Sequence, residues 1–85
     1  MNIEIISCLN DNYSYLIHDK PSNMVAIVDP SEFDPCNNII DNKYKKLDFI
    51  LNTHHHYDHV GGNEDLKKKY GSIVLGFEDD KNRIP

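Results

Sequence analysis

Two short apolar runs, at residues 24–28 and 47–51, constrain the fold of this 85-residue chain more than any other feature. Runs of this kind are typical of central strands in a sheet that is covered on both faces. Between them, residues 35–46 place apolar side chains at helix-like spacing. The order of strand, helix and strand predicts an α/β arrangement around a central sheet.

Weaker signals surround this unit with further strands and one more helix. Turn-forming residues cluster at 10–12 and 20–23, and Gly71 suits the position just after a helix. The expected strands are residues 3–6, 13–18 and 72–75, and the expected second helix is residues 63–70. Two helices are too few to cover both faces of such a sheet, so the sequence predicts an incomplete domain.

Length and composition narrow the classes of protein to consider. The chain is one domain at most, and 39% hydrophobic with 27% charged residues is a globular balance. A net charge of -5 argues against a nucleic-acid partner. No apolar run approaches the roughly 18–20 residues of a membrane span, and no secretion signal is visible in the first residues. We therefore expect a cytoplasmic protein without a membrane partner, with Cys8 and Cys36 as reduced, buried thiols.

The densest chemical feature is the segment 53–63, which reads THHHYDHVGGN. Imidazole and carboxylate are ligands that zinc and related divalent metals prefer. In an extended segment, alternate residues point the same way, so His54 and His56 can reach one ion. Asp58 and His59 follow where the chain turns, and they can face a second ion. The segment therefore predicts a hydrolytic metal site.

The surroundings of these histidines weigh against a solvated polar loop, which is the simplest alternative. Alternating histidines, a carboxylate and a glycine pair occur together, and Gly61 and Gly62 let the backbone turn without a side-chain clash. Two ions about 3.5–4 Å apart can share a hydroxide and polarise a carbonyl.

These residues carry a family resemblance. The pattern His54-x-His56-x-Asp58-His59 resembles the signature of the metallo-β-lactamase fold, and the longer string 53–63 is most similar to the glyoxalase II (hydroxyacylglutathione hydrolase) subfamily. The stretches that also fit this subfamily are residues 11–17, 26–30 and 83–85. The resemblance implies an α/β (α+β) fold in which residues 1–85 form the N-terminal portion of an αββα metallo-β-lactamase sandwich, incomplete as it stands.

The same resemblance implies a ligand set and a reaction. His54 and His56 would bind the first metal, and Asp58 and His59 the second. Zn²⁺ is the expected metal, two ions per complete site, although iron and manganese also occur in the family. The implied reaction is hydrolysis of the thioester S-D-lactoylglutathione to D-lactate and glutathione. Asp58 would also orient the attacking hydroxide, which makes it the expected catalytic residue.

Asp29 and the downstream region leave questions open. Asp29 either supports a ligand histidine or serves as a turn residue before Pro30. The family pattern needs two more histidines and a bridging aspartate, which would lie downstream of residue 85. The acids after His59 are expected to be solvated; they are Glu64, Asp65, Glu78, Asp79 and Asp80. We therefore expect little or no thioesterase activity from this chain alone.

Alternative functions remain at this stage. One is a non-catalytic remnant or interaction module, and another is a different hydrolase of the superfamily, such as a lactonase. The expected partners are a small glutathione thioester and a complementing C-terminal half. Three aromatic residues are expected in the core, namely Tyr13, Tyr15 and Phe49. His18 is expected to be structural or solvated, and the role of Tyr57 is open.

Overall fold

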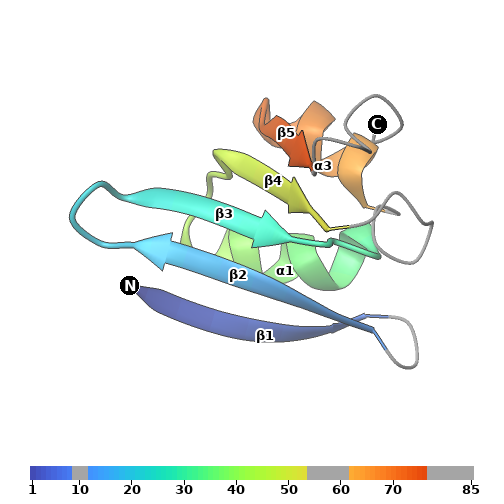
Figure 1. The fold of residues 1–85 in the computed structure, drawn as a ribbon, viewed down its shortest axis with the longest axis horizontal. Helices are drawn as coiled ribbons and strands as arrows, with labels where there is room; N and C mark the ends of the chain where they lie inside the picture. The colour runs from blue at the N-terminus through green and yellow to red at the C-terminus, as the bar shows by residue number, and fades with distance from the viewer. Residues whose placement is uncertain (9–11, 54–61, 77–85) are drawn as a thin grey trace.

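The computed structural model describes residues 1–8, 12–53 and 62–76. These residues form one five-stranded sheet, in the strand order β1-β2-β3-β4-β5, with helices packed against it (Figure 1). In chain order the elements are β1 (Asn2–Cys8), β2 (Asn12–Asp19), β3 (Met24–Val28), α1 (Phe33–Lys43), β4 (Phe49–Asn52), α3 (Asn63–Tyr70) and β5 (Ile73–Gly76). No helix among the described residues is long and apolar enough to cross a membrane.

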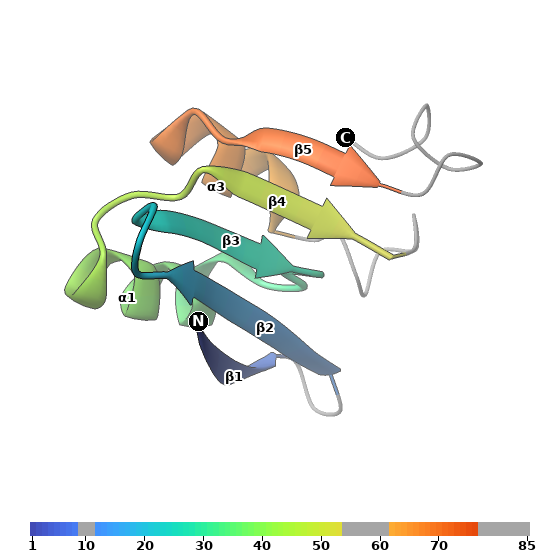
Figure 2. The ribbon, with the colours of Figure 1, turned by 60° about the vertical axis from the view of Figure 1, so that its left-hand side comes forward.

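The direction of the strands places both helices on the same side of the sheet. β1, β2 and β3 pair antiparallel, whereas β3, β4 and β5 pair parallel. Parallel neighbours need a crossover, which α1 supplies between β3 and β4 and α3 supplies between β4 and β5. Because such crossovers are right-handed and both step in the same direction along the sheet, α1 and α3 lie on one face (Figure 2).

The hydrophobic core lies between this face and the two helices. The strands alternate, so every second side chain points towards the helices. The buried apolar residues are Ile6, Cys8, Leu16, Val25, Ile27 and Ile50 from the strands, Cys36, Ile40 and Leu66 from the helices, and Leu47 just before β4. The core therefore draws on all but one of the strands, and Val74 of β5 packs against it while only partly buried.

The opposite face of the sheet is open, which corrects two expectations. The run 24–28 is not buried on both faces: Met24 is 39% exposed, whereas Ile27 is completely buried. Tyr13 and Tyr15 are exposed rather than in the core, and Phe49 is only partly covered. The large exposed hydrophobic residues of the strands are Ile3, Ile5, Tyr13, Tyr15, Met24, Ile73 and Leu75. This face is open because α1 and α3 both pack against the other one. Their placement confirms that two helices are too few to cover both faces of the sheet.

Local signals located the second helix better than the first. The expected helix 63–70 is confirmed at both ends, and Gly71 closes it with a φ of 69° and an N–H···O bond to Lys67 of 2.8 Å. The expected helix 35–46 instead begins at Phe33 and ends at Lys43. It ends early because Lys45 takes a left-handed φ of 58° and donates its N–H to the Ile40 carbonyl. The following strand correspondingly begins at Phe49.

Candidate metal centre

The histidine-rich segment connects the end of β4 to the start of α3. The predicted ligands His54, His56, Asp58 and His59 lie outside the described residues, so their arrangement stays a prediction. Among residues 1–8, 12–53 and 62–76, no group of three or more His, Cys, Asp or Glu side chains is placed to hold a metal. The structure does describe the frame from which the segment departs and to which it returns.

Asp29 holds the residue that directly precedes the first predicted ligand. Its carboxylate accepts the backbone N–H of Thr53 at 2.8 Å and the Thr53 hydroxyl at 2.5 Å. Its own N–H donates to the Leu51 carbonyl at 2.8 Å, so the end of β4 is fixed through backbone and side chain together. Asp29 also ends β3 in a left-handed conformation, with a φ of 51°. It is thus a strand-ending residue whose carboxylate anchors the segment.

Buried hydroxyl groups hold Asp29 in this conformation. Ser14, which is fully buried on β2, donates to the Asp29 carbonyl at 2.7 Å. Ser31 donates to the same carbonyl at 3.4 Å. A left-handed conformation is costly for a residue with a Cβ, although Asp tolerates it better than most. These bonds help to fix a conformation that would otherwise be one of several.

A reciprocal pair of amides closes the base of the segment. Asn52, the last residue of β4, donates to the Asn63 side-chain oxygen at 3.2 Å, and Asn63, the first residue of α3, donates back at 2.6 Å. Their exposed fractions are 4% and 0%. We call this pair the asparagine clasp. Sequence reasoning missed it, although an asparagine at each end of the motif was the available signal.

Gly62 is needed for close packing rather than for backbone freedom. Its N–H donates to the Pro30 carbonyl at 2.6 Å. A Cβ at this position would lie 2.9 Å from that oxygen and 3.1 Å from the carbonyl carbon of Glu32. Its φ of -96° is open to any residue. The predicted role for a glycine here is therefore confirmed with a specific cause, whereas Gly61 lies outside the described residues.

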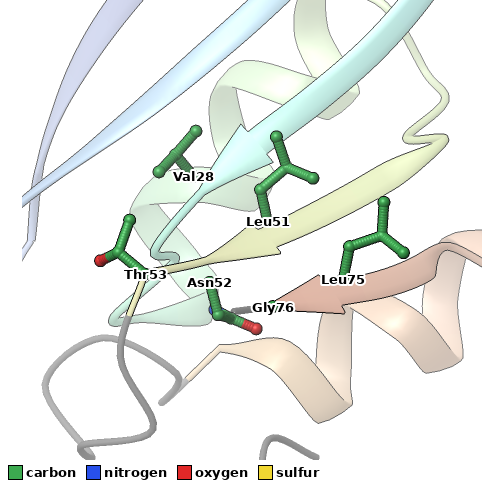
Figure 3. Close-up of a pocket in the computed structure, with 6 residues that line it drawn as sticks. All are labelled: Val28, Leu51, Asn52, Thr53, Leu75 and Gly76. Atoms are coloured by element: carbon green, nitrogen blue, oxygen red, sulfur yellow. The ribbon is translucent and has the colours of Figure 1, made fainter. Parts of the chain in front are cut away.

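A shallow pocket of about 340 Å³ opens where the three parallel strands end (Figure 3). In open α/β sheets, ligands commonly bind at this edge. Val28, Leu51 and Leu75 face the same side because they are paired across the parallel register, and Thr53 borders the pocket beside them. The remaining lining residues are Asn52 and Gly76. The walls are mainly apolar, so they can shape a site but supply little of its chemistry.

The other predicted residues are placed as follows. Glu64 and Asp65 are exposed on the first turn of α3, which confirms that they are solvated. Nε2 of His18 lies 3.0 Å from Oδ1 of Asn23, and its ring lies 4.6 Å from that of Tyr44, so this histidine is structural. The predictions for Tyr57, Glu78, Asp79 and Asp80 concern residues outside the described ones.

Comparison with known proteins agrees with this arrangement. The family model of the metallo-beta-lactamase superfamily matches residues 10–83. The hydroxyacylglutathione hydrolase of Pelagibacter ubique (strain HTCC1062) is 58% identical over 85 residues, which are the whole of this chain and 36% of that protein. The hydroxyacylglutathione hydrolases of Crocosphaera subtropica and Rhodospirillum rubrum are 44% and 40% identical, again over the whole chain and over 34% and 33% of their own lengths. The chain thus spans about a third of the length of these relatives.

Proposed function

Because the chain belongs to the metallo-β-lactamase superfamily, we propose that it forms part of a metal-dependent hydrolase of S-D-lactoylglutathione. The superfamily implies a metal cofactor. We propose two zinc ions, held by His54 and His56 and by Asp58 and His59, because three imidazoles and a carboxylate suit zinc. The relatives are named hydroxyacylglutathione hydrolases, which supports a glutathione thioester as the substrate.

The observation that carries this proposal is the anchoring of the motif at both of its ends. When bound, the metal ions would act as Lewis acids towards the thioester carbonyl. The chain's own contribution is position, since a functional group must be held within about 0.5 Å of its productive place. Asp29 fixes Thr53 immediately before His54, and the asparagine clasp fixes the point where the segment returns. Asp58 would orient the attacking group from within the segment.

The open face of the sheet supports a further part of the proposal. Residues 1–85 would be the N-terminal part of a metallo-β-lactamase-like domain, completed by a C-terminal half that covers this face and brings the remaining ligands. The exposed apolar side chains lie on β1, β2, β3 and β5, from Ile3 at one edge of the sheet to Leu75 at the other. An apolar surface of this extent is typical of a contact with another part of a protein.

A chimera tests the proposal directly. Residues 1–85 would replace the matching third of the Pelagibacter hydrolase, and zinc content and S-D-lactoylglutathione hydrolysis would be measured beside the parent enzyme. We expect two zinc ions per chain and clear turnover, which His56→Ala and Asp58→Ala should each abolish. Residues 1–85 alone should show little or no turnover. A folded chimera that binds no metal would refute the proposal, and cleavage of lactones in place of the thioester would support the lactonase alternative.

The same open face favours one second candidate, a non-catalytic interaction module. Exposed strands and an uncovered apolar face promote association. This candidate predicts that the chimera folds but neither binds zinc nor hydrolyses the thioester. It also predicts that residues 1–85 self-associate as concentration rises, which sedimentation velocity would detect.

A further inference from the structure

Two buried cysteines lie in contact in the core between the sheet and the helices. Cys8 is the last residue of β1, and Cys36 is in the first half of α1. Their Sγ atoms are 3.7 Å apart, and both are free thiols, 1% and 0% exposed. A disulfide bond is about 2.05 Å long, so the two sulfur atoms need to approach by only about 1.7 Å. The proposed hydrolysis uses neither thiol.

The hydrogen bonds around these thiols lead to the anchor of the candidate site. The single hydroxyl proton of Ser14 is committed to the Asp29 carbonyl. Ser14 Oγ also lies 3.3 Å from Cys8 Sγ, so Cys8 must donate its S–H to Ser14. A continuous path therefore runs from Cys36 through Cys8 and Ser14 to Asp29, whose carboxylate holds Thr53.

We propose that Cys8 and Cys36 are a redox-sensitive dithiol that hydrogen peroxide converts into a disulfide. One thiolate attacks a peroxide oxygen, the O–O bond breaks, and a sulfenic acid and hydroxide form. The second thiolate attacks the sulfenic sulfur, the S–S bond forms, and hydroxide leaves. Two thiols lose two electrons and two protons in total, and one peroxide becomes two water molecules.

The surroundings of the two cysteines make their oxidation slow and restrict it to small oxidants. Burial, and after it the neighbouring Cys8, raises the pKa of Cys36 from 9.0 to about 12. With this pKa, little of the Cys36 thiolate is present at neutral pH. Because the thiolate is the reacting form, oxidation is slow at neutral pH and becomes faster as pH rises. Complete burial favours a small oxidant such as hydrogen peroxide over a bulky one such as glutathione disulfide.

Closure of the disulfide has two structural consequences. It joins β1 to α1 across 28 residues of chain, which constrains the unfolded state and stabilises the fold. It also removes the S–H that Cys8 donates to Ser14, and so it changes the hydrogen bonding behind Asp29. The oxidation state of the pair should therefore be detectable at Thr53.

The test oxidises the purified chain with hydrogen peroxide at pH 7 and pH 9. We expect loss of two hydrogens by intact mass, a monomeric product, faster reaction at pH 9, and a rise in Tm of about 10 °C. The Thr53 amide resonance should shift on oxidation and return on reduction with dithiothreitol. Cys8→Ser and Cys36→Ser should show neither change, and the reduced parent serves as control if a variant folds poorly. Thiols that stay reduced, a cross-linked dimer, sulfinic acids without a disulfide, or an unmoved Thr53 amide would each overturn the proposal.

Discussion

The asparagine clasp should behave as one energetic unit, and a double-mutant cycle can measure it. Asn52→Ala and Asn63→Ala would be made singly and together. Each single change removes both hydrogen bonds of the clasp, of 2.6 and 3.2 Å, between side chains that are at most 4% exposed. A buried hydrogen bond contributes about 0.5–1.5 kcal/mol, so we expect each single variant to lose about 2 kcal/mol of unfolding free energy. The second change breaks no further bond of the clasp and should cost only about 1 kcal/mol more, which makes the coupling energy about 1 kcal/mol.

Urea unfolding followed by circular dichroism gives the four free energies that the cycle needs. Asn38, an exposed asparagine on α1, provides the matched control. Asn38→Ala combined with Asn52→Ala should be additive within about 0.5 kcal/mol, because the two sites share no partner. A coupling energy below about 0.5 kcal/mol between Asn52 and Asn63 would show that the clasp does not hold the base of the segment.

Three further predictions concern the same frame and the thiol pair. Gly62→Ala should cost about 1–3 kcal/mol in urea unfolding, since its Cβ would meet a backbone oxygen at 2.9 Å. Asp29→Ala should cost about 3 kcal/mol because it removes two charge-assisted bonds to Thr53, whereas Thr53→Val, which loses only the hydroxyl bond, should cost about half as much. The free energy of unfolding should fall by up to about 1.4 kcal/mol per pH unit between pH 9 and pH 12. The reason is that the Cys36 thiol loses its proton at lower pH in the unfolded chain than in the folded one. Cys36→Ser should remove that part of the slope.

Each of these predictions has its own control and its own contradicting result. Gly71→Asn should cost less than Gly62→Ala, because asparagine tolerates the left-handed φ of 69° better than most residues and nothing lies within 4 Å of a Cβ there. A Gly62→Ala protein as stable as the parent would mean that the neighbouring backbone yields. Equal losses of unfolding free energy in Asp29→Ala and Thr53→Val would mean that the bond from the Thr53 backbone N–H to Asp29 does not contribute to stability. An unchanged alkaline slope in Cys36→Ser would assign that slope to other groups.

Elements with strong local signals were predictable from the sequence. Residues 24–28 form β3 as expected because a short β-branched run suits a strand, and residues 63–70 form α3 as expected because Gly71 ends it. The first helix was misplaced by two or three residues at its ends. Its C-terminus depends on the left-handed Lys45, a residue type that carries no signal for that conformation.

The candidate site divides in the same way. Its chemistry stays a prediction from the sequence, in which the candidate ligand types follow one another along a single segment from His54 to His59. Its frame was not predictable, because the bonds from Asp29 to Thr53 span 24 residues and the clasp spans 11. Asn, Asp and Ser are ordinary turn residues, and neither spacing nor composition shows which of them are buried and paired.

The sequence by itself thus determined the type of most elements, the proposal of a metal site at residues 54–59 and the resemblance that pointed to the superfamily, since each rests on neighbouring residues. Tertiary structure alone decided which sheet face is covered, because that follows from the direction in which successive right-handed crossovers step. It also brought Cys8 to Cys36 and Asn52 to Asn63. Such pairs form only when distant parts of the chain pack together. Packing depends on the shape and burial of side chains rather than on the local sequence pattern.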